Sequence, residues 1–340
     1  MRYVIIGAGA VGGVIGGRLA QAGHGDVVLV ARGSQYEALR DKGLRVETPD
    51  GPHTHQLPVV AGPEALGTLR ADDVLILAVK TQDSAAALAA WGPRPVEGGG
   101  TAALRLPLVC AQNGVESERL ALRTFQRVYG MCVWLPATFV EPGVVRAPGA
   151  PLSGMLHLGR YPSGSDETAR AISADLEKGL LEAPVVDDVM RWKYAKLLAN
   201  LANSIEAVSG VLTSEEGIAL FRRARAEGEA VLDAAGVAYA SQDEEKATRA
   251  DKITFEPFDS SPRGGGSSWQ SLQRGAGSIE ADYLNGEIAL LGRLHGVPTP
   301  INDVLQELAD EAAREGRSAG ETSVAELVAA VDARCAAIVD

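Results

Sequence analysis

Polar side chains recur at helical spacing within residues 189–208 of the sequence. Lys196 and Asn200 are four residues apart, so they project from the same side of a predicted helix. Asn203 and Ser204 continue this side, and no carboxylate lies among the four residues. Such a set of hydrogen-bonding groups suits the binding of an anionic or carbonyl-bearing small molecule. A solvated helix face is the alternative interpretation.

Lys193 lies three residues before Lys196 and extends the polar side of the same predicted helix. A lysine can act as a general acid, because its ammonium group can donate a proton to an oxygen on which negative charge develops. The sequence favours Lys196 for this role, since Asn200 shares its side of the helix. It leaves open whether Lys193 contributes.

The chain opens with a glycine pattern in a context typical of dinucleotide binding. Tyr3–Ile6 form an apolar run that predicts a buried parallel strand, and Gly7, Gly9 and Gly12 follow directly. In this pattern the first glycine allows a tight turn, the second lets a pyrophosphate approach, and the third allows close packing of the next helix. That helix, predicted over residues 10–22, would direct its free N–H groups at the phosphates. The residues predicted to contact the nucleotide here are Gly7, Ala8, Gly9, Ala10, Val11 and Gly12.

The end of the second predicted strand, residues 26–31, indicates which nucleotide binds. In an NAD site this end carries an acidic residue for the ribose hydroxyl, but here it carries Arg32, with no carboxylate before Glu37. An arginine can pair with a 2′-phosphate through its fork of donors. The sequence therefore predicts NADPH/NADP as the cofactor. A solvated loop cation is the alternative interpretation of Arg32.

Two further apolar strands, predicted over residues 73–79 and 107–111, end in polar residues. Lys80 follows the first strand and Asn113 follows the second, at the position where doubly wound sheets bind ligands. We therefore predict that both side chains face the cofactor. The alternatives are a surface lysine at a helix start and a plain Asn-Gly turn.

Strands and helices alternate in the first half of the chain, and further strands are predicted over residues 128–158. From about Asp187 the sequence is mostly helical. At 340 residues the chain is long for one compact core, so two domains are expected. We predict an α/β fold with a Rossmann-type, doubly wound, NADP-binding domain at residues 1–186 and an all-helical substrate and catalytic domain at residues 187–340.

Composition argues against several classes of function. A formal charge of −12 disfavours binding to nucleic acid and to anionic membranes. No apolar run suits a membrane helix, and the six glycines within Tyr3–Gly17 argue against a signal peptide. The three cysteines have no metal-ligand spacing and suit a reducing cytoplasm. The five histidines are scattered too, so no metal centre is predicted.

Six motifs follow one another along the chain. They are Gly7-x-Gly9-x-x-Gly12, Val79-Lys80-Thr81, Gln112-Asn113-Gly114, Lys196-Leu-Leu-Ala-Asn200, Gly264-Gly-Gly-Ser-Ser268 and Glu280-Ala-Asp-Tyr-Leu-Asn-Gly286. In these motifs, and in the spacing from Ser268 to Glu280, the sequence resembles the ketopantoate reductases, the 2-dehydropantoate 2-reductase family of NADPH enzymes. The resemblance covers nearly the whole chain.

The resemblance implies a reaction and a role for several side chains. The expected reaction is the NADPH-dependent reduction of a 2-oxo acid, 2-dehydropantoate (ketopantoate), to the 2-hydroxy acid pantoate in pantothenate biosynthesis. Lys196 is implied as the general acid, with Glu280 as a second catalytic residue. The residues assigned to the cofactor are Lys80, Asn113 and Glu280, and those assigned to the substrate are Asn113, Asn200, Ser204 and Ser268.

Ser204 departs from the family pattern, which commonly has a second asparagine eight residues after the catalytic lysine. A serine is shorter and lacks the paired donor and acceptor of an amide. The chain is also longer than compact members around residues 243–266 and in its C-terminal region. These differences leave the substrate more open than the class of reaction.

Two other functions therefore stay open. One is an NADPH reductase of the same architecture that acts on another ketone, 2-oxo acid or imine, which Ser204 favours. The other is a non-catalytic NADP-binding sensor, although a pure binder needs neither a catalytic lysine nor substrate ligands. The oligomeric state is also open, with a homodimer as the working hypothesis.

Overall fold

The computed structural model describes residues 1–249, 252–255, 264–275 and 277–339. The chain divides into two compact units, residues 1–193 with 241–261 and residues 194–240 with 262–340. We refer to them as the first and the second unit.

This division differs from the single boundary that the sequence predicts after residue 186. The chain returns to the first unit after residue 240. There β14 (Ile253–Phe255) pairs antiparallel with β11 (Gly149–Pro151). Glu244 also forms an ion pair with Arg191. Such pairing between distant segments leaves no local pattern from which a boundary could be predicted.

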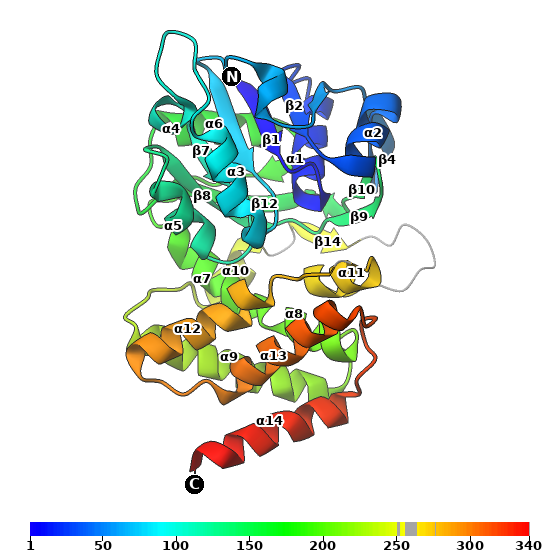
Figure 1. The fold of residues 1–340 in the computed structure, drawn as a ribbon, viewed down its shortest axis with the longest axis vertical. Coiled ribbons are helices and arrows are strands. Elements are labelled where there is room, and N and C mark those ends of the chain that lie inside the picture. Colours follow the sequence, from blue (N-terminus) through cyan, green and yellow to red (C-terminus); the bar gives the residue numbers. More distant parts are fainter. Residues whose placement is uncertain (250–251, 256–263, 276, 340) are drawn as a thin grey trace. The chain divides into compact units, whose positions relative to one another are not determined.

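The first unit contains an eight-stranded sheet (Figure 1). Its strands are β1 (Arg2–Ile6), β2 (Val27–Val30), β5 (Val59–Val60), β6 (Asp73–Leu77), β7 (Leu108–Cys110), β8 (Val128–Trp134), β12 (Gly154–Arg160) and β13 (Leu181–Glu182). Their order is β13-β12-β8-β7-β6-β1-β2-β5. Because β1 pairs in parallel with both β2 and β6, the strand order reverses beside β1. Ligands of open α/β sheets bind beyond the carboxyl ends of the strands at such a point.

Helices pack on both faces of this sheet. They are α1 (Ala10–Gln21), α2 (Gly33–Lys42), α3 (Ser84–Trp91), α4 (Ala102–Arg105), α5 (Glu116–Leu122) and α6 (Glu167–Lys178). Tyr3 and Ile5 of β1 share a core with α1 and α6, whereas Val4 and Ile6 share a second core with α3, α4 and α5. Successive residues of β1 point to opposite faces of the sheet, and both faces are covered by helices. Every residue from Tyr3 to Ile6 is therefore buried, which explains why this strand is apolar throughout. The predicted Rossmann-type class is confirmed.

A second, four-stranded sheet packs against α1. It consists of β3 (Leu44–Thr48), β4 (Gly51–His55), β9 (Thr138–Glu141) and β10 (Val144–Arg146), in the order β4-β3-β10-β9. The strands predicted within residues 128–158 are present as β8 to β12. β3 was not predicted, and it pairs with β10, which is distant in sequence.

The second unit is helical, as predicted, and no strand occurs in its described residues, 194–240, 264–275 and 277–339. The helices that lie wholly within it are α8 (Ala202–Ser209), α9 (Glu215–Ala234), α11 (Ser267–Gln273), α12 (Asn285–His295), α13 (Pro300–Glu315) and α14 (Val324–Val339). They enclose a core that includes Ile205, Leu220 and Leu305, which are 1% exposed or less. Nowhere in the described chain is there a helix with the length and apolar character to span a membrane.

The helix predicted over residues 189–208 is interrupted. α7 (Val189–Asn200) ends one residue before Leu201, and α8 begins immediately after it. The Leu201 carbonyl accepts a hydrogen bond of 3.4 Å from the side chain of Asn285. Leu201 itself keeps helical backbone angles, with φ −60° and ψ −21°, so the interruption is confined to one residue of the hydrogen-bond pattern.

Candidate active site

The glycine pattern forms a tight junction between β1 and α1. Gly7 has a φ of +104°, and a Cβ atom there would lie 2.8 Å from the Val79 nitrogen. A Cβ atom at Gly12 would lie 2.1 Å from the Gly7 carbonyl oxygen and 2.9 Å from Ile5 Cγ2. No larger residue fits either position, because the turn, the helix and the strand touch one another here. Two of the three glycines therefore have the packing roles predicted for them.

Gly9 differs, because a Cβ atom there would meet nothing within 4 Å. Gly9 is the N-cap of α1, no side chain among the described residues caps this end, and the first turn of the helix contains no acidic residue. The first N–H groups of α1 have no partner within the helix. Open space beside uncapped N–H groups at the positive end of a helix dipole fits a pyrophosphate.

Arg32 lies two residues after the end of β2 and is the N-cap of α2. Its side chain is exposed and forms no hydrogen bond or ion pair with any residue that the structure describes. Because the guanidinium group is not engaged elsewhere in the described chain, it is available to an anion.

Lys80 and Asn113 lie at the carboxyl ends of neighbouring strands. Lys80 follows β6, is half-buried and begins the 3₁₀ turn η2 (Thr81–Asp83). Asn113 follows β7, and its Oδ1 atom is buried without a partner in the described chain. Since Val79 contacts the Gly7 turn, the loop that carries Lys80 lies beside the glycine pattern.

In the second unit, α7 carries Lys196 and Asn200, both half-buried. Asn200 Nδ2 is shielded from solvent and has no hydrogen-bond partner among the described residues. The side of α7 that is predicted to carry both Lys196 and Asn200 therefore includes a hydrogen-bond donor, Asn200 Nδ2, that has no acceptor among the described residues.

The segment that carries Ser268 is attached to α8. Asn203 Nδ2 donates a hydrogen bond of 3.3 Å to Ser267 Oγ, and the Gly266 N–H donates one of 2.6 Å to Glu206 Oε2. These contacts hold the start of α11 against α8. Ser268 is 1% exposed, and its Oγ atom has no partner in the described part of the chain. Residues 260–263, in the glycine-rich region before this motif, lie outside the described residues.

Glu280 and Ser204 are both buried. Glu280 is 5% exposed and immediately precedes the 3₁₀ turn η3 (Ala281–Tyr283). Ser204 is 0% exposed, and its hydroxyl donates a hydrogen bond of 2.6 Å to Asn285 Oδ1. The single hydroxyl proton of Ser204 is therefore already used in a hydrogen bond within the protein. A contact between Ser204 and the substrate stays a prediction from the sequence.

Family models match two long segments of the chain. The model described as Ketopantoate reductase PanE/ApbA matches residues 3–163, and Ketopantoate reductase PanE/ApbA C terminal matches residues 188–313. The chain belongs to the ketopantoate reductase family. The family and the oxidoreductase class predicted from the sequence motifs are therefore confirmed.

Individual members of the family extend this similarity over almost the whole length. A 2-dehydropantoate 2-reductase of Mesorhizobium japonicum is 32% identical, over 91% of this chain and 96% of that protein. Another, of Halobacterium salinarum, is 30% identical over 93% of this chain and 100% of that protein.

Solved structures agree with the fold. The crystal structure of a PanE/ApbA family ketopantoate reductase from Ralstonia eutropha JMP134 has a TM-score of 0.74 and 28% identity, over 93% of this chain and 99% of that chain. The ternary structure of D-mandelate dehydrogenase with NADH and anilino(oxo)acetate has a TM-score of 0.77, with the same coverage. Its 21% identity supports a shared fold only.

Gln35, which the sequence does not indicate as a site residue, supports the glycine pattern of this ketopantoate reductase family member. Its Nε2 atom donates a hydrogen bond of 2.7 Å to the Ala8 carbonyl, and its Oε1 atom accepts one of 2.7 Å from the Gly143 N–H. Gln35 therefore ties the glycine-rich loop after β1 to α2 and to the turn between β9 and β10. No local signal distinguishes such a glutamine from any other polar residue on a helix.

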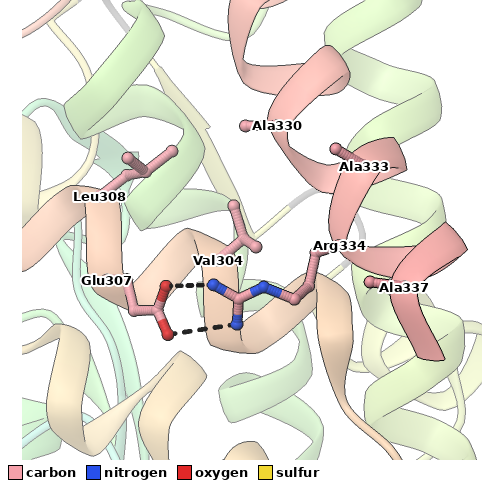
Figure 2. Close-up of a pocket in the computed structure, with 7 residues that line it drawn as sticks. All are labelled: Val304, Glu307, Leu308, Ala330, Ala333, Arg334 and Ala337. Atoms are coloured by element: carbon pink, nitrogen blue, oxygen red, sulfur yellow. Dashed lines mark hydrogen bonds and ion pairs between the residues drawn. The ribbon is translucent and has the colours of Figure 1, made fainter.

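A surface groove between α13 and α14 contains none of the predicted site residues. Figure 2 shows its lining, which consists of Val304, Glu307, Leu308, Ala330, Ala333, Arg334 and Ala337. The Arg334 guanidinium group pairs with Glu307 at 2.7 Å. Because these two charges neutralise each other, the groove offers no unpaired charge to a 2-oxo acid.

Proposed function

We propose that this protein is an NADPH-dependent reductase of a 2-oxo acid, with 2-dehydropantoate as the substrate and pantoate as the product. The observation that carries the proposal is the pair of unused polar atoms Asn200 Nδ2 and Ser268 Oγ, within a chain of the ketopantoate reductase family. Buried polar groups normally have partners, so these atoms suit a polar ligand. A carboxylate and a hydroxyl group are both partners that they can bind.

The residues that would hold the cofactor fit a dinucleotide. The open backbone at Gly9 and the uncapped start of α1 suit a pyrophosphate, and Arg32 suits a 2′-phosphate. Lys80 and Asn113 follow the neighbouring strands, and the resemblance adds Glu280. When bound, a dihydronicotinamide supplies the hydride for the reduction of a ketone.

Lys196 is proposed as the general acid. Reduction of a ketone places negative charge on its oxygen, and a lysine ammonium group can donate the proton that neutralises this charge. Asn200 and Ser268 would bind the carboxylate and the hydroxyl group of the substrate and so fix its carbonyl. Glu280 would orient the ammonium group of Lys196.

The relatives support 2-dehydropantoate in particular, since those of Mesorhizobium japonicum and Halobacterium salinarum carry the name 2-dehydropantoate 2-reductase. One observation favours a different 2-oxo acid, ketone or imine. Ser204 stands where the family commonly has an asparagine, and its hydroxyl is bonded to Asn285. We therefore keep a reductase of the same type with another substrate as the second candidate.

NADPH oxidation tests the proposal. The purified protein is assayed with 2-dehydropantoate and with a panel of 2-oxo acids, ketones and imines, each with NADPH and with NADH. We expect the highest kcat/KM for 2-dehydropantoate with NADPH. A higher kcat/KM for another substrate would favour the second candidate. NADPH binding without turnover of any compound would instead indicate a sensor that binds the nucleotide.

A further inference from the structure

A buried ion pair joins α5 to the start of α7 within the first unit. Lys193 Nζ pairs with Glu118 Oε1, and the two side chains are 2% and 0% exposed. Burial raises the pKa of the Glu118 carboxyl, and the Lys193 ammonium group opposes this shift. Glu118 Oε2 has no hydrogen-bond partner among the described residues. Because a buried pair of this kind costs desolvation energy, stability alone is a weak reason for it.

The same ammonium group reaches the loop after β7. Lys193 Nζ donates a hydrogen bond of 3.0 Å to the backbone carbonyl of Gln112, the residue before Asn113. Glu118 therefore holds the ammonium group in place while the ammonium group holds this loop.

Gln112 connects that loop to the loop after β6. Its Nε2 atom donates hydrogen bonds of 2.8 Å to the Val79 carbonyl and 2.8 Å to Ser84 Oγ. Val79 is the residue before Lys80. A single buried side chain, 4% exposed, thus links the two loops that carry Lys80 and Asn113.

We propose that Lys193, Glu118 and Gln112 are positioning residues that hold the loops of Lys80 and Asn113 in the geometry that binds NADPH. The proposal rests on the proposed function, which places these two loops beside the cofactor. Two of the three ammonium donors of Lys193 are directed to a carboxylate and to a backbone carbonyl, so we assign Lys193 a positioning role and not a contact with the substrate. Two lysines three residues apart on α7 therefore have different tasks.

A set of variants separates positioning from stability. Lys193→Met leaves the Glu118 charge buried without its partner, so both the Tm and NADPH affinity should fall. We expect the Kd for NADPH to rise by about 10- to 150-fold, the range for loss of one hydrogen bond to a charged group. Replacing both partners, in Lys193→Met with Glu118→Leu, should restore most of the Tm. It should not restore NADPH affinity, because the Gln112 carbonyl still lacks its donor.

Gln112→Met offers an independent test, since it removes the bonds to Val79 and Ser84 without burying a charge. It should raise the Kd for NADPH by a similar factor. Lys178→Met is the matched control, because Lys178 is 65% exposed on α6 and pairs only with Asp175 among the described residues. This control should change neither the Kd nor the Tm. NADPH fluorescence titration and thermal denaturation supply the two readouts.

Two results would overturn the inference. The first is a Lys193→Met variant with a lowered Tm and an unchanged Kd for NADPH, and the second is a double variant in which both values recover. Failure of the proposed function has a different signature, since the wild-type protein would then bind NADPH without reducing any 2-oxo acid. The Kd comparison still decides the positioning role in that case. A wild-type protein that does not bind NADPH would overturn both proposals.

Discussion

The Ser204 hydroxyl donates a hydrogen bond of 2.6 Å to Asn285 Oδ1, and both side chains are 0% exposed. The amide of Asn285 continues the network, because its Nδ2 atom donates to Asn302 Oδ1 at 2.9 Å. Asn302 Nδ2 in turn donates to Glu227 Oε1 at 2.8 Å. A continuous chain of polar groups, buried except for the half-buried Glu227, thus connects α8, α12, α13 and α9.

Ser204→Ala should destabilise the protein more than it affects catalysis. The variant leaves Asn285 Oδ1 without its donor, and an unsatisfied buried acceptor costs about 1–3 kcal/mol. Urea denaturation measures this loss. Ser209→Ala is the control, since among the described residues Ser209 Oγ donates only to the Ile205 carbonyl one turn earlier and should contribute less. Unchanged stability with a raised KM for the 2-oxo acid would instead support a direct substrate contact.

Arg32→Ala should discriminate between the two nicotinamide cofactors. We expect NADPH binding to weaken by about 1.5–3 kcal/mol, the range for a charge-assisted hydrogen bond, whereas NADH binding should hardly change. Isothermal titration calorimetry measures both. Arg40→Ala on the same helix is the control, because Arg40 is exposed and pairs with Asp41. Equal losses for NADPH and NADH would contradict the assignment of Arg32 to the 2′-phosphate.

Lys196→Ala should lower kcat by about 10²–10⁴-fold, the usual contribution of a positioned general acid. NADPH should still bind, because the proposed nucleotide contacts include no atom of this lysine. Steady-state kinetics and NADPH titration measure the two effects. The comparison with Lys193→Met is informative, since that variant should mainly weaken NADPH binding. If kcat were nearly unchanged in Lys196→Ala, another group would have to supply the proton.

Asp310 should make the stability of the second unit depend on pH. Burial, together with the charge of Asp282 and a hydrogen bond to it, raises the pKa of Asp310 to about 7 from its ordinary value of 3.8. The folded state therefore binds this proton more tightly than the unfolded state. The resulting stabilisation is fully present below pH ~4 and is lost as the pH rises through ~7.

Asp310→Asn removes this titration. Its stability should fall less than that of the wild type between pH ~5 and ~8, and it should be the more stable protein at the upper end. Thermal denaturation across this range provides the measurement. Asp282→Asn should also reduce the dependence, because it removes the neighbouring charge that favours protonation of Asp310. Parallel pH profiles for wild type and Asp310→Asn would show that the carboxyl is not protonated in the folded state near neutral pH.

The sequence by itself determined the features that depend on local pattern. The apolar run at Tyr3–Ile6 followed by Gly7 and Gly12 specifies a strand, a tight turn and a closely packed helix, because each glycine answers a steric demand within a few residues. The helical character of the second unit also follows from local periodicity. The ordered motifs were sufficient to identify the family.

Only the tertiary structure decided which polar side chains form hydrogen bonds and ion pairs with other residues of the protein. Lys193 and Lys196 differ little in sequence, but Lys193 is bonded to Glu118 and Gln112 in the first unit. Ser204 is likewise committed to Asn285, far along the chain. These contacts join residues that are distant in sequence, so they leave no periodic pattern and no characteristic spacing in the sequence from which they could be predicted. Their partners become known only when the packing of the elements brings the side chains together.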